Sequence, residues 1–596
     1  MKLQNLISCA LAANAMLGIA PASEQIPAGG TSIIAKDIFV TPSIKFIGKE
    51  YAELKMVPVT GMPFKTALQM NVKTQPIKEY AVQLKAGLTL AVKKGDTLLA
   101  SFYARTLKGD NDTSDGQVTF AIKGDISQAL ITRHTTNPGA EWQQYFVPID
   151  AKDSADLSEG VVTFSFGSMI QTLEIGGIEV LNYEGNVALN TLPKTEITYA
   201  GRELNAAWRK DATKRIEEIR KADITVVVKD AEGKIVPNAT VDVNMTKHAF
   251  NWGAAVTSRA FEHSAAAKPI LENHQKLFNQ GVPITYFVWN LQETPEGKSG
   301  ANKILKYFRD HDMTTRAHVL VWERMDHFPP DVQEMVKNKE ADKLRARITK
   351  YVKDTVGEYK GRVDEWVVEN EAVDNSQIRD ILGEASIAEW FKAAREADPS
   401  ARLMINENHL EGLKLDKSDR LLHLVDVIEK NGGKVDTIGI QGHAGSKPTA
   451  PETLMAYYNK LAATGKKLAI TEYDFASEDE QLKADYTRDL MTVVFSHPAF
   501  NCLTMWRFWD GQPQQRHSVV YANDWTMRPA GKVYEDLVFD QWWTKVDGKT
   551  NAEGKFTTRG FLGNYDIVAS ANGKTQTVKA VLAKGTPNVV EITLPN

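Results

Sequence analysis

Two glutamates in the second half of the chain have the residue type and the setting that acid–base chemistry needs. Glu371 lies in the segment WVVENEAV (366–373), and Glu472 lies in KLAITEYD (467–474). Each glutamate follows a short apolar run that predicts a buried β-strand. A pair of facing carboxyl groups can cleave a glycosidic bond, one as proton donor and the other as nucleophile. We therefore predict that Glu371 and Glu472 form a catalytic pair.

Strand-like and helical patterns alternate from about residue 250 to 540, and these elements must bring the two glutamates together. The expected strands are 250–256, 282–289, 314–322, 362–371, 402–408, 437–443, 467–474 and 503–510. Eight strands alternating with helices over about 290 residues predict a (β/α)8 TIM barrel of the α/β class. The alternative is a doubly wound open sheet, but neither a G-x-G-x-x-G nor a P-loop motif is present. In a barrel, the fourth and seventh strands would place both glutamates on one rim.

Polar and aromatic residues mark the expected C-terminal ends of these strands. They are His318, Trp322, Glu323, Glu369, Asn370, Glu371, Asn406, Glu407, Gln441, His443, Glu472, Asp474, Trp506, Trp509 and Asp510. An ordinary ion pair or hydrogen bond would explain any one of them. It does not explain the whole set, because burying a carboxylate is costly unless it is paired. We expect His443 to hold Glu472 by a hydrogen bond and Asn370 to contact a sugar hydroxyl.

These motifs resemble the catalytic domain of glycoside hydrolase family 10, the retaining endo-β-1,4-xylanases, over about residues 240–540. The matching residues are Asn370 and Glu371 (acid/base motif), Thr471 and Glu472 (nucleophile motif), Gln441 and His443 (sixth-strand motif), His318, Trp506 and the closing segment 523–529. The resemblance implies a hydrolase whose Glu371 is the proton donor and whose Glu472 is the nucleophile. We expect no cofactor and no metal, because the histidine spacing of the chain is not that of a ligand set.

The second strand departs from the family pattern, which is usually Glu-Asn-Glu-Met-Lys-Trp. Here the segment reads ITYFVW (284–289), so that Trp289 alone remains, and Glu323 stands where the family has a second third-strand histidine. Losing a charged hydrogen-bond partner typically removes about 1.5–3 kcal/mol. We expect hydrolysis to be retained and sugar specificity to change, with Glu323 and Glu407 as replacement contacts. The predicted substrate-binding residues are His318, Asn370, Gln441, His443, Trp506, Trp289, Glu323, Asn406 and Trp509.

Three further segments flank the barrel. Residues 30–190 alternate short strands with turn residues, which predicts an antiparallel β-sandwich. This segment resembles carbohydrate-binding modules of the galactose-binding-like type, although a purely structural sandwich is the alternative. Its candidate binding residues are Trp142, Tyr103 and Phe102. Residues 191–249 predict a solvated linking helix and a β-hairpin, and residues 541–596 predict a small second β-sandwich.

The N-terminus and the composition bear on location and partners. Residues 1–22 are typical of a secretory signal peptide, with Lys2 before an apolar stretch and a cleavage-like site at Ala20–Ala22. We therefore expect a secreted or periplasmic protein with no membrane span. A net charge of −4 gives no reason to expect nucleic acid as a partner. Cleavage would leave Cys502 as a lone thiol, which we expect to be buried, and we expect a monomer.

Three functions are compatible with these residues. The leading interpretation is a secreted retaining hydrolase that cleaves internal β-1,4 linkages of a polysaccharide, with xylan as the default substrate. A second is a retaining hydrolase of another β-glycan, such as a β-glucan or galactan, or a transglycosylase on the same barrel. A third is a non-catalytic polysaccharide-binding protein. The presence of both glutamates argues against the third, because binding alone needs neither of them.

Overall fold

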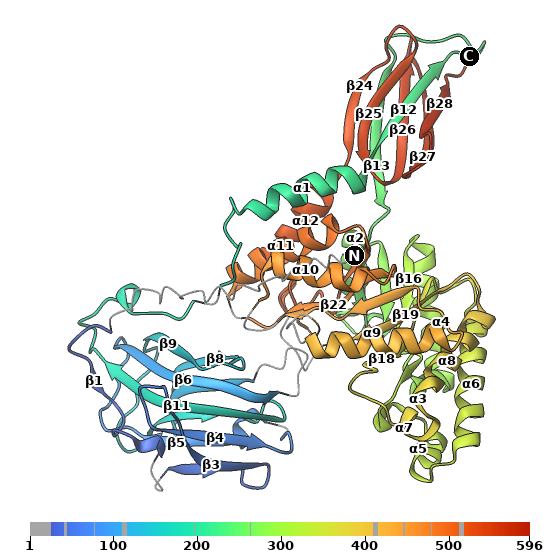
Figure 1. Cartoon of the computed structure of the whole chain (residues 1–596). Helices are drawn as coiled ribbons and strands as arrows, with labels where there is room; N and C mark the ends of the chain where they lie inside the picture. Colours follow the sequence, from blue (N-terminus) through green and yellow to red (C-terminus); the bar gives the residue numbers. More distant parts are fainter. Residues whose placement is uncertain are drawn as a thin grey trace, which may run out of the picture. The chain divides into compact units, whose positions relative to one another are not determined.

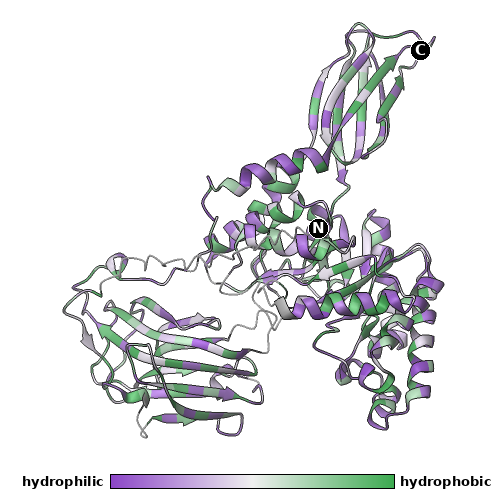
Figure 2. Cartoon of the chain, in the orientation of Figure 1, coloured by the Kyte–Doolittle hydropathy of each residue, from purple (hydrophilic) through white to green (hydrophobic). Residues whose placement is uncertain are grey.

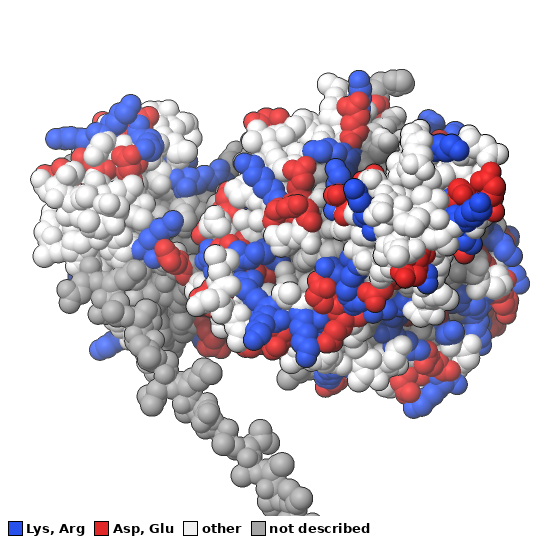
Figure 3. All heavy atoms as spheres, turned by 90° about the horizontal axis from the view of Figure 1, so that it is seen from above, with Lys and Arg blue, Asp and Glu red and all other residues white. Residues whose placement is uncertain are grey.

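The computed structural model describes residues 26–596 except for 41–43, 77, 110–115, 197, 263, 409, 411–414, 445–447, 478 and 512–517. The expected signal peptide therefore lies outside the described residues. The chain divides into two units, the first ending at Glu196 and the second running from there to Asn596. Lys and Arg side chains are interspersed with Asp and Glu over the face seen in Figure 3. In the described part of the chain, no helix combines the length and the apolar character needed to cross a membrane.

The first unit is an antiparallel β-sandwich (Figure 1). Its strands are β1 (Thr31–Ser32), β2 (Lys45–Ile47), β3 (Ala52–Pro58), β4 (Thr66–Val72), β5 (Gln83–Gly87), β6 (Thr97–Gly109), β7 (Val118–Gly124), β8 (Leu130–Thr136), β9 (Gln143–Asp150), β10 (Gly160–Ser165) and β11 (Gln171–Asn182). One sheet has the order β3-β4-β11-β6-β9, with β1 on β11, and the other has the order β2-β5-β10-β7-β8. Hydrophobic and hydrophilic residues alternate along these strands (Figure 2), and the apolar sides face each other across the core. The predicted sandwich is confirmed.

Parallel strands of the second unit close into a barrel. They are β14 (Asn251–Val256), β15 (Gln280–Pro283), β16 (Thr314–Ala317), β17 (Val321–Trp322), β18 (Glu365–Asn370), β19 (Arg402–Glu407), β20 (Thr437–Ile440), β21 (His443–Ala444), β22 (Lys467–Phe475) and β23 (Phe500–Met505). The order is β16-β15-β14-β23-β22-β20-β19-β18, and β16 also pairs with β18, which completes the ring. β17 extends the third strand along β18, and β21 extends the sixth along β22. The predicted (β/α)8 barrel is confirmed.

Helices surround the barrel because the strands bury both of their faces. The longer helices are α2 (Ala267–Leu277), α4 (Pro295–Asp310), α5 (Pro330–Lys337), α6 (Ala341–Glu358), α8 (Ile387–Ala397), α9 (Leu415–Lys430), α10 (Pro451–Ala462), α11 (Glu480–Ser496) and α12 (Pro529–Asp536). On β18, Val367 packs inside the barrel with Cys502, whereas Trp366 and Val368 join the core under the helices. The thiol of Cys502 is free and buried, as predicted.

The second strand is shorter than the sequence pattern predicts. β15 ends at Pro283, and the residues that follow lead into a short helix, α3 (Trp289–Gln292). Trp289 stacks on Tyr351 of α6 with ring centroids 4.3 Å apart, and Arg347 lies over the indole ring. Trp289 is only 2% exposed. Its burial among helices draws the segment out of the barrel wall, so the prediction of a strand over 282–289 is wrong beyond Pro283.

The small sandwich uses strands from both sides of the barrel in the sequence. They are β12 (Lys221–Lys229), β13 (Thr240–His248), β24 (Lys545–Lys549), β25 (Lys555–Phe561), β26 (Gly563–Ala571), β27 (Lys574–Leu582) and β28 (Val589–Thr593). The sheets have the orders β25-β12-β28 and β24-β13-β26-β27. The expected hairpin of β12 with β13 is therefore wrong. Val226 on β12 and Val243 on β13 are both buried in one core, which places the two strands in facing sheets.

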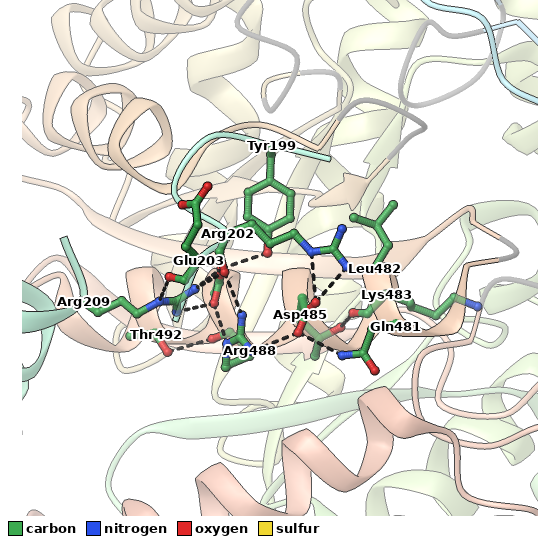
Figure 4. Close-up of polar contacts among 12 residues, drawn as sticks. Tyr199, Arg202, Glu203, Arg209, Gln481, Leu482, Lys483, Asp485, Arg488 and Thr492 are labelled. Atoms are coloured by element: carbon green, nitrogen blue, oxygen red, sulfur yellow. Dashed lines mark hydrogen bonds and ion pairs between the residues drawn. The ribbon is translucent and has the colours of Figure 1, made fainter. Parts of the chain in front are cut away.

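The helix predicted before this sandwich is present as α1 (Ala207–Arg220), but it is not fully solvated. Its Trp208 is buried against the rest of the unit. The segment before the helix is fastened to α11 (Figure 4): the Tyr199 hydroxyl donates to Asp489 at 2.8 Å, and Arg202 pairs with Asp485 at 2.9 Å. Arg209 also pairs with Asp489, at 2.6 Å. These ion pairs explain why a mixed-charge helix lies against the barrel.

Candidate active site

Glu371 stands immediately after β18 in an uncommon backbone conformation. Its φ is +55°, in the left-handed region, which costs of order 1–3 kcal/mol for a residue other than glycine. Three backbone hydrogen bonds hold this conformation. The Glu371 N–H donates to Asn406 O at 2.8 Å, and the Glu371 carbonyl accepts from the N–H groups of Asp374 at 3.1 Å and Asn375 at 3.0 Å. The turn fixes the Glu371 side chain at the end of the fourth barrel strand.

The Glu371 carboxyl group is bound on both oxygens. Oε1 accepts a hydrogen bond from Gln441 Nε2 at 3.1 Å, and Oε2 accepts one from Trp322 Nε1 at 3.1 Å. Asn375 Nδ2 lies 3.4 Å from the same Oε2. The donors to the Glu371 carboxyl group come from the third strand, from the sixth strand and from the loop that follows Glu371. Three elements therefore determine the position of this carboxyl group.

Glu472 lies on β22 and is 4% exposed. Its Oε1 accepts a hydrogen bond from Asn406 Nδ2 at 2.8 Å, and its Oε2 is 3.4 Å from His443 Nε2. His318 Nδ1 is 4.0 Å from Oε1. Each oxygen of this carboxyl group therefore faces a nitrogen atom, which is the environment that an anionic nucleophile requires.

Asn406 and Gln441 link the two glutamates reciprocally. The carbonyl of Asn406 accepts from the backbone of Glu371, while its side chain donates to the carboxyl group of Glu472. The carbonyl of Gln441 accepts from the backbone of Glu472 at 2.7 Å, while its side chain donates to the carboxyl group of Glu371. Each bridging residue thus binds one glutamate by its main chain and the other by its side chain. This arrangement brings the predicted pair into one site.

Two histidines and a tryptophan complete the group. His443 Nδ1 is 2.8 Å from Asp474 Oδ1, so its ring bridges the carboxyl groups of Asp474 and Glu472. Burial lowers the pKa of His318 below its ordinary value, although the negative charge of Glu472 opposes the shift. The ring of Trp506 lies edge-on to His318, with centroids 5.3 Å apart, and is partly exposed. His318 is therefore neutral near pH 7 and lies between the aromatic ring and Glu472.

Glu323 and Glu407 do not make the substrate contacts that their positions suggest. Glu323 is fully buried, pairs with Arg379, and accepts the backbone N–H groups of Ile378 at 2.7 Å and Arg379 at 2.9 Å. Glu407 is also fully buried; it accepts the N–H of Val373 at 3.0 Å and pairs with a lysine, Lys417, at 3.1 Å. Both carboxylates therefore anchor the loop that follows Glu371, and the prediction of sugar contacts at Glu323 and Glu407 is wrong.

A third buried carboxyl group, Glu369, lies near these two. Neither of its oxygens has a hydrogen-bond partner among the residues that the structure describes. Burial raises the pKa of Glu369 well above its ordinary value, and the charges of Glu323 and Glu407 add to the shift. Ionising Glu369 is therefore harder than ionising an ordinary glutamate, although the charge of Arg379 opposes the shift.

Two other predicted substrate residues, Trp289 and Trp509, stack on other aromatic rings. Trp289 belongs to the core beside Tyr351, as described above. Trp509 stacks on Trp525, with centroids 4.5 Å apart and an interplanar angle of 5°, and its indole N–H donates to Asn523 O at 3.0 Å. The structure assigns both indoles to packing. Asn370 is at the site, where its side-chain oxygen accepts from Asn406 at 2.8 Å.

Sequence reasoning did not assign a role to three residues that support the site. Trp322 donates to Glu371, Asp474 binds His443, and the Thr471 hydroxyl donates to Asn406 Oδ1 at 2.7 Å. Trp322 and Asp474 belong to the set of polar and aromatic residues at the strand ends. Their position in the sequence was therefore enough to predict that they lie at the site. Thr471 precedes Glu472 by one residue on β22; the nucleophile motif of the family resemblance includes it, but that motif does not indicate its hydrogen bond to Asn406.

One glutamate follows the fourth strand of this (β/α)8 barrel and the other lies on the seventh, and hydrogen bonds hold both in place. This arrangement is typical of barrels that hydrolyse glycosidic bonds. The family model described as Glycosyl hydrolase family 10 matches residues 242–536. A β-1,4-xylanase of Dictyoglomus thermophilum is 30% identical over 258 residues, which cover 41% of this chain and 68% of that one. The chain belongs to glycosyl hydrolase family 10.

Other relatives match the chain over a smaller share of their own length. Anti-sigma-I factor RsgI6 of Acetivibrio thermocellus is 32% identical over 371 residues, which cover 62% of this chain and 47% of that one. Endo-1,4-beta-xylanase 2 of Arabidopsis thaliana is 26% identical over 404 residues, which cover 66% of this chain and 37% of that one. The chain thus spans half or less of the length of several curated relatives that it matches.

Proposed function

We propose that the chain is a retaining glycoside hydrolase that cleaves internal β-1,4 linkages of a polysaccharide, with xylan as its first candidate substrate. The reciprocal bracing of Glu371 and Glu472 by Asn406 and Gln441 carries this proposal, because it places two carboxyl groups in one site from opposite sides of the barrel. Relatives named as xylanases support the substrate. Residues 1–22 support export, and sequencing the N-terminus of the exported protein tests whether it begins after Ala22.

The reaction follows from the roles of the two carboxyl groups. Glu472 attacks the anomeric carbon while protonated Glu371 gives its proton to the departing glycosidic oxygen, so that the C–O bond breaks and a glycosyl ester forms on Glu472. Glu371, now ionised, then takes a proton from water. The water oxygen bonds to the anomeric carbon and releases Glu472. Two displacements at one carbon retain its configuration, and the site returns to its starting protonation.

A second candidate, hydrolysis of another β-glycan, is favoured by the altered second strand. Thr285 stands where the family has an amide side chain, and its hydroxyl accepts the N–H of Ser258 at 3.2 Å. Ile284 and Val288 offer no hydrogen bond from their side chains. The shell that reads the sugar beside the scissile bond therefore differs, although the catalytic pair is kept. A panel of xylan, mixed-linkage β-glucan, galactan and mannan distinguishes the two, since activity on xylan alone excludes the second candidate.

The test of the catalytic assignment uses Glu371→Gln and Glu472→Gln. We expect Glu371→Gln to lower kcat about 10²–10⁴-fold on polysaccharide, and much less on an aryl glycoside whose leaving group needs no proton. Glu472→Gln should abolish turnover of both substrates, because the nucleophile is lost. Product released by the unaltered protein should keep the β-configuration when followed by NMR. Inversion at the anomeric carbon would exclude Glu472 as a nucleophile.

The proposed oligomeric state is a monomer, and light scattering on the purified chain tests it. A mass near 66.2 kDa for the chain with its first 22 residues, or slightly less after their removal, is the expected result. Twice that mass would contradict the proposal.

A further inference from the structure

A cavity of about 520 Å³ lies between the barrel and the small sandwich of the second unit. Segments of both parts line this junction cavity: 275–279 and 311–313 of the barrel, and 246–248, 564–566 and 579–581 of the sandwich. The barrel segments come directly before β15 and β16, whereas Glu371 follows the end of β18. The cavity is therefore at the end of the barrel opposite to the catalytic pair. Its volume is within the range of about 300–1,000 Å³ that is typical of small-ligand sites.

The rings of Phe539 and Trp543 form an aromatic part of the cavity wall, with centroids 5.7 Å apart. Phe539 is 36% exposed, and Trp543 is partly exposed. The ring of His248 lies edge-on to Trp543 at 5.3 Å, and its Nε2 is 3.0 Å from the carbonyl oxygen of Val538. Burial lowers the pKa of His248 to about 4, so a neutral imidazole supports the indole at pH 7. The aromatic wall is thus held in place and is accessible from the solvent.

Four polar side chains of the lining are available to a ligand. None of them makes a hydrogen bond or an ion pair with another residue that the structure describes: Gln275, Asn564, Asp566 and Lys579. Asn564 and Asp566 are two residues apart on β26, so they point to the same side of the sheet. Lys579 stands opposite Asp566 on the neighbouring strand, β27. Hydrogen-bond donors and acceptors therefore lie next to each other on the sandwich wall of the cavity.

The charges around the junction cavity balance one another. Lys247 pairs with Asp312 at 2.9 Å, and Lys276 pairs with Glu535 at 2.9 Å. Lys579, the third lysine among the described lining residues, stands opposite the carboxylate of β26. A wall without excess charge favours a neutral ligand over a phosphate or a carboxylate, because it offers an anion no unbalanced cation.

We propose that the junction cavity is a second, non-catalytic site that binds one or more sugar rings of a neutral glycan. A sugar ring presents an apolar C–H surface, which fits the rings of Phe539 and Trp543, and hydroxyl groups, which fit the unpartnered amide, carboxylate and ammonium groups. The choice of a glycan rests on the proposed function, because a polysaccharide hydrolase works among glycan chains. A site at this end of the barrel holds a chain without occupying the catalytic site.

The test follows amide hydrogen exchange by mass spectrometry in the full-length chain carrying Glu472→Gln, so that an added oligosaccharide is not consumed. Xylohexaose and cellohexaose are the probes. We expect one of them to slow exchange in the cavity segments 275–279 and 538–543 as well as in the catalytic segment 366–375. Each of these segments reports on its own site, so the two binding events are observed separately.

Adding Trp543→Ala or Asp566→Ala should raise the oligosaccharide concentration that protects the cavity segments about tenfold or more. Protection of 366–375 should not change. Asp242→Ala is the matched control for Asp566→Ala, because Asp242 is a partly exposed aspartate of the same sheet outside the lining. Unchanged melting temperatures show that the variants are folded.

Cavity segments that neither oligosaccharide protects would overturn the proposal, and so would equal protection in Trp543→Ala, Asp566→Ala and the parent. The outcome is separable from that of the barrel. Protection of the cavity segments without any hydrolysis by the chain with native Glu472 would sink the proposed function alone. Hydrolysis with protection confined to 366–375 would sink this inference alone.

Discussion

Asn406 and Gln441 give the site a property that neither glutamate has alone. Because each of them binds the main chain of one glutamate and the side chain of the other, a displacement of either strand is passed to both carboxyl groups. Truncating one amide therefore disturbs proton donor and nucleophile together. Both residues act by positioning, through hydrogen bonds to the carboxyl groups that react.

Changing Asn406 to aspartate tests this positioning role. The substitution replaces the N–H donor, 2.8 Å from Glu472 Oε1, with a second carboxylate oxygen. Two carboxylates in one site do not both ionise readily, so the acidic limb of the pH–rate profile should move to higher pH. We expect kcat to fall about 10²–10³-fold, as when a preorganised donor is lost. The exposed Asn431→Asp is the charge-matched control, and a profile of Asn406→Asp that stays in place would contradict the role.

At the scale of elements, buried carboxyl groups accept hydrogen bonds from the backbone of the loop after β18. Glu323 accepts two of its N–H groups and Glu407 accepts a third, so the loop that begins at Glu371 is fixed at several points. Glu369 lies near them with no hydrogen-bond partner among the described residues. Two of the three carboxyl groups thus stabilise the loop, and the third weakens the fold whenever it ionises.

Glu369→Gln should stabilise the protein, and more strongly as pH rises. The pKa of Glu369 is raised in the folded state, so between the ordinary pKa near 4.5 and the folded value the native protein binds more protons than the unfolded chain. The free energy of unfolding of the unaltered protein therefore falls with rising pH, by up to about 1.4 kcal/mol per pH unit from this group. A glutamine at position 369 does not ionise, so it adds no pH dependence to the free energy of unfolding. Urea unfolding at pH 5, 6, 7 and 8 measures the difference.

Glu365→Gln on the same strand is the matched control, and its effect should have the opposite sign. Burial raises the pKa of Glu365, but Arg316 and Arg402 outweigh it and leave the pKa lowered. The carboxylate pairs with Arg316 at 2.9 Å inside the barrel. Removing one partner of a buried pair costs about 3–5 kcal/mol. Equal pH slopes for the unaltered protein and Glu369→Gln would show that Glu369 is ionised in the folded state.

Strand positions and the residues at their ends were predictable because both obey local rules. The apolar run before Glu371 and the one before Glu472 identify the strands, and barrel geometry then places their ends on one rim. The partner of Glu323 was not predictable, since Arg379 lies 56 residues later in the short helix α7 (Arg379–Leu382) and nothing in either segment marks the pair. Its position in the sequence predicted that Trp289 contacts the substrate. In the structure its ring stacks on Tyr351, a distant residue in the sequence. Long-range packing accounts for these errors.

At the scale of the whole molecule, the barrel of the second unit is inserted in the sequence between two groups of strands. Both groups belong to the same small sandwich. β12 and β13 precede the barrel, and β24 to β28 follow it. The sandwich therefore cannot be removed by a single cut without leaving unpaired strands. This contrasts with the first unit, whose strands all pair within residues 31–182.

Ending the chain at residue 544 tests this dependence. The truncation removes every sheet neighbour of β12 and β13, exposing Ile224 and Val241 from their shared core. Unpaired apolar strands are sites of aggregation, so we expect an insoluble or early-melting product. The control begins at residue 198, lacks the first unit, and should melt as the second unit does in the full chain. A soluble chain ending at 544 with an unchanged melting temperature would contradict the shared sandwich.

The divided sandwich also sets an order of events during synthesis. His248 ends β13, and the first later strand of the sandwich begins at Lys545, 297 residues on (545 − 248). At about 5–20 residues per second, roughly 15–60 s pass between the two. Throughout this interval β12 and β13 have left the ribosome without their sheet neighbours. The barrel, whose parts are made within that time, can fold first, and the later strands β24 to β28 then close the sandwich around β12 and β13.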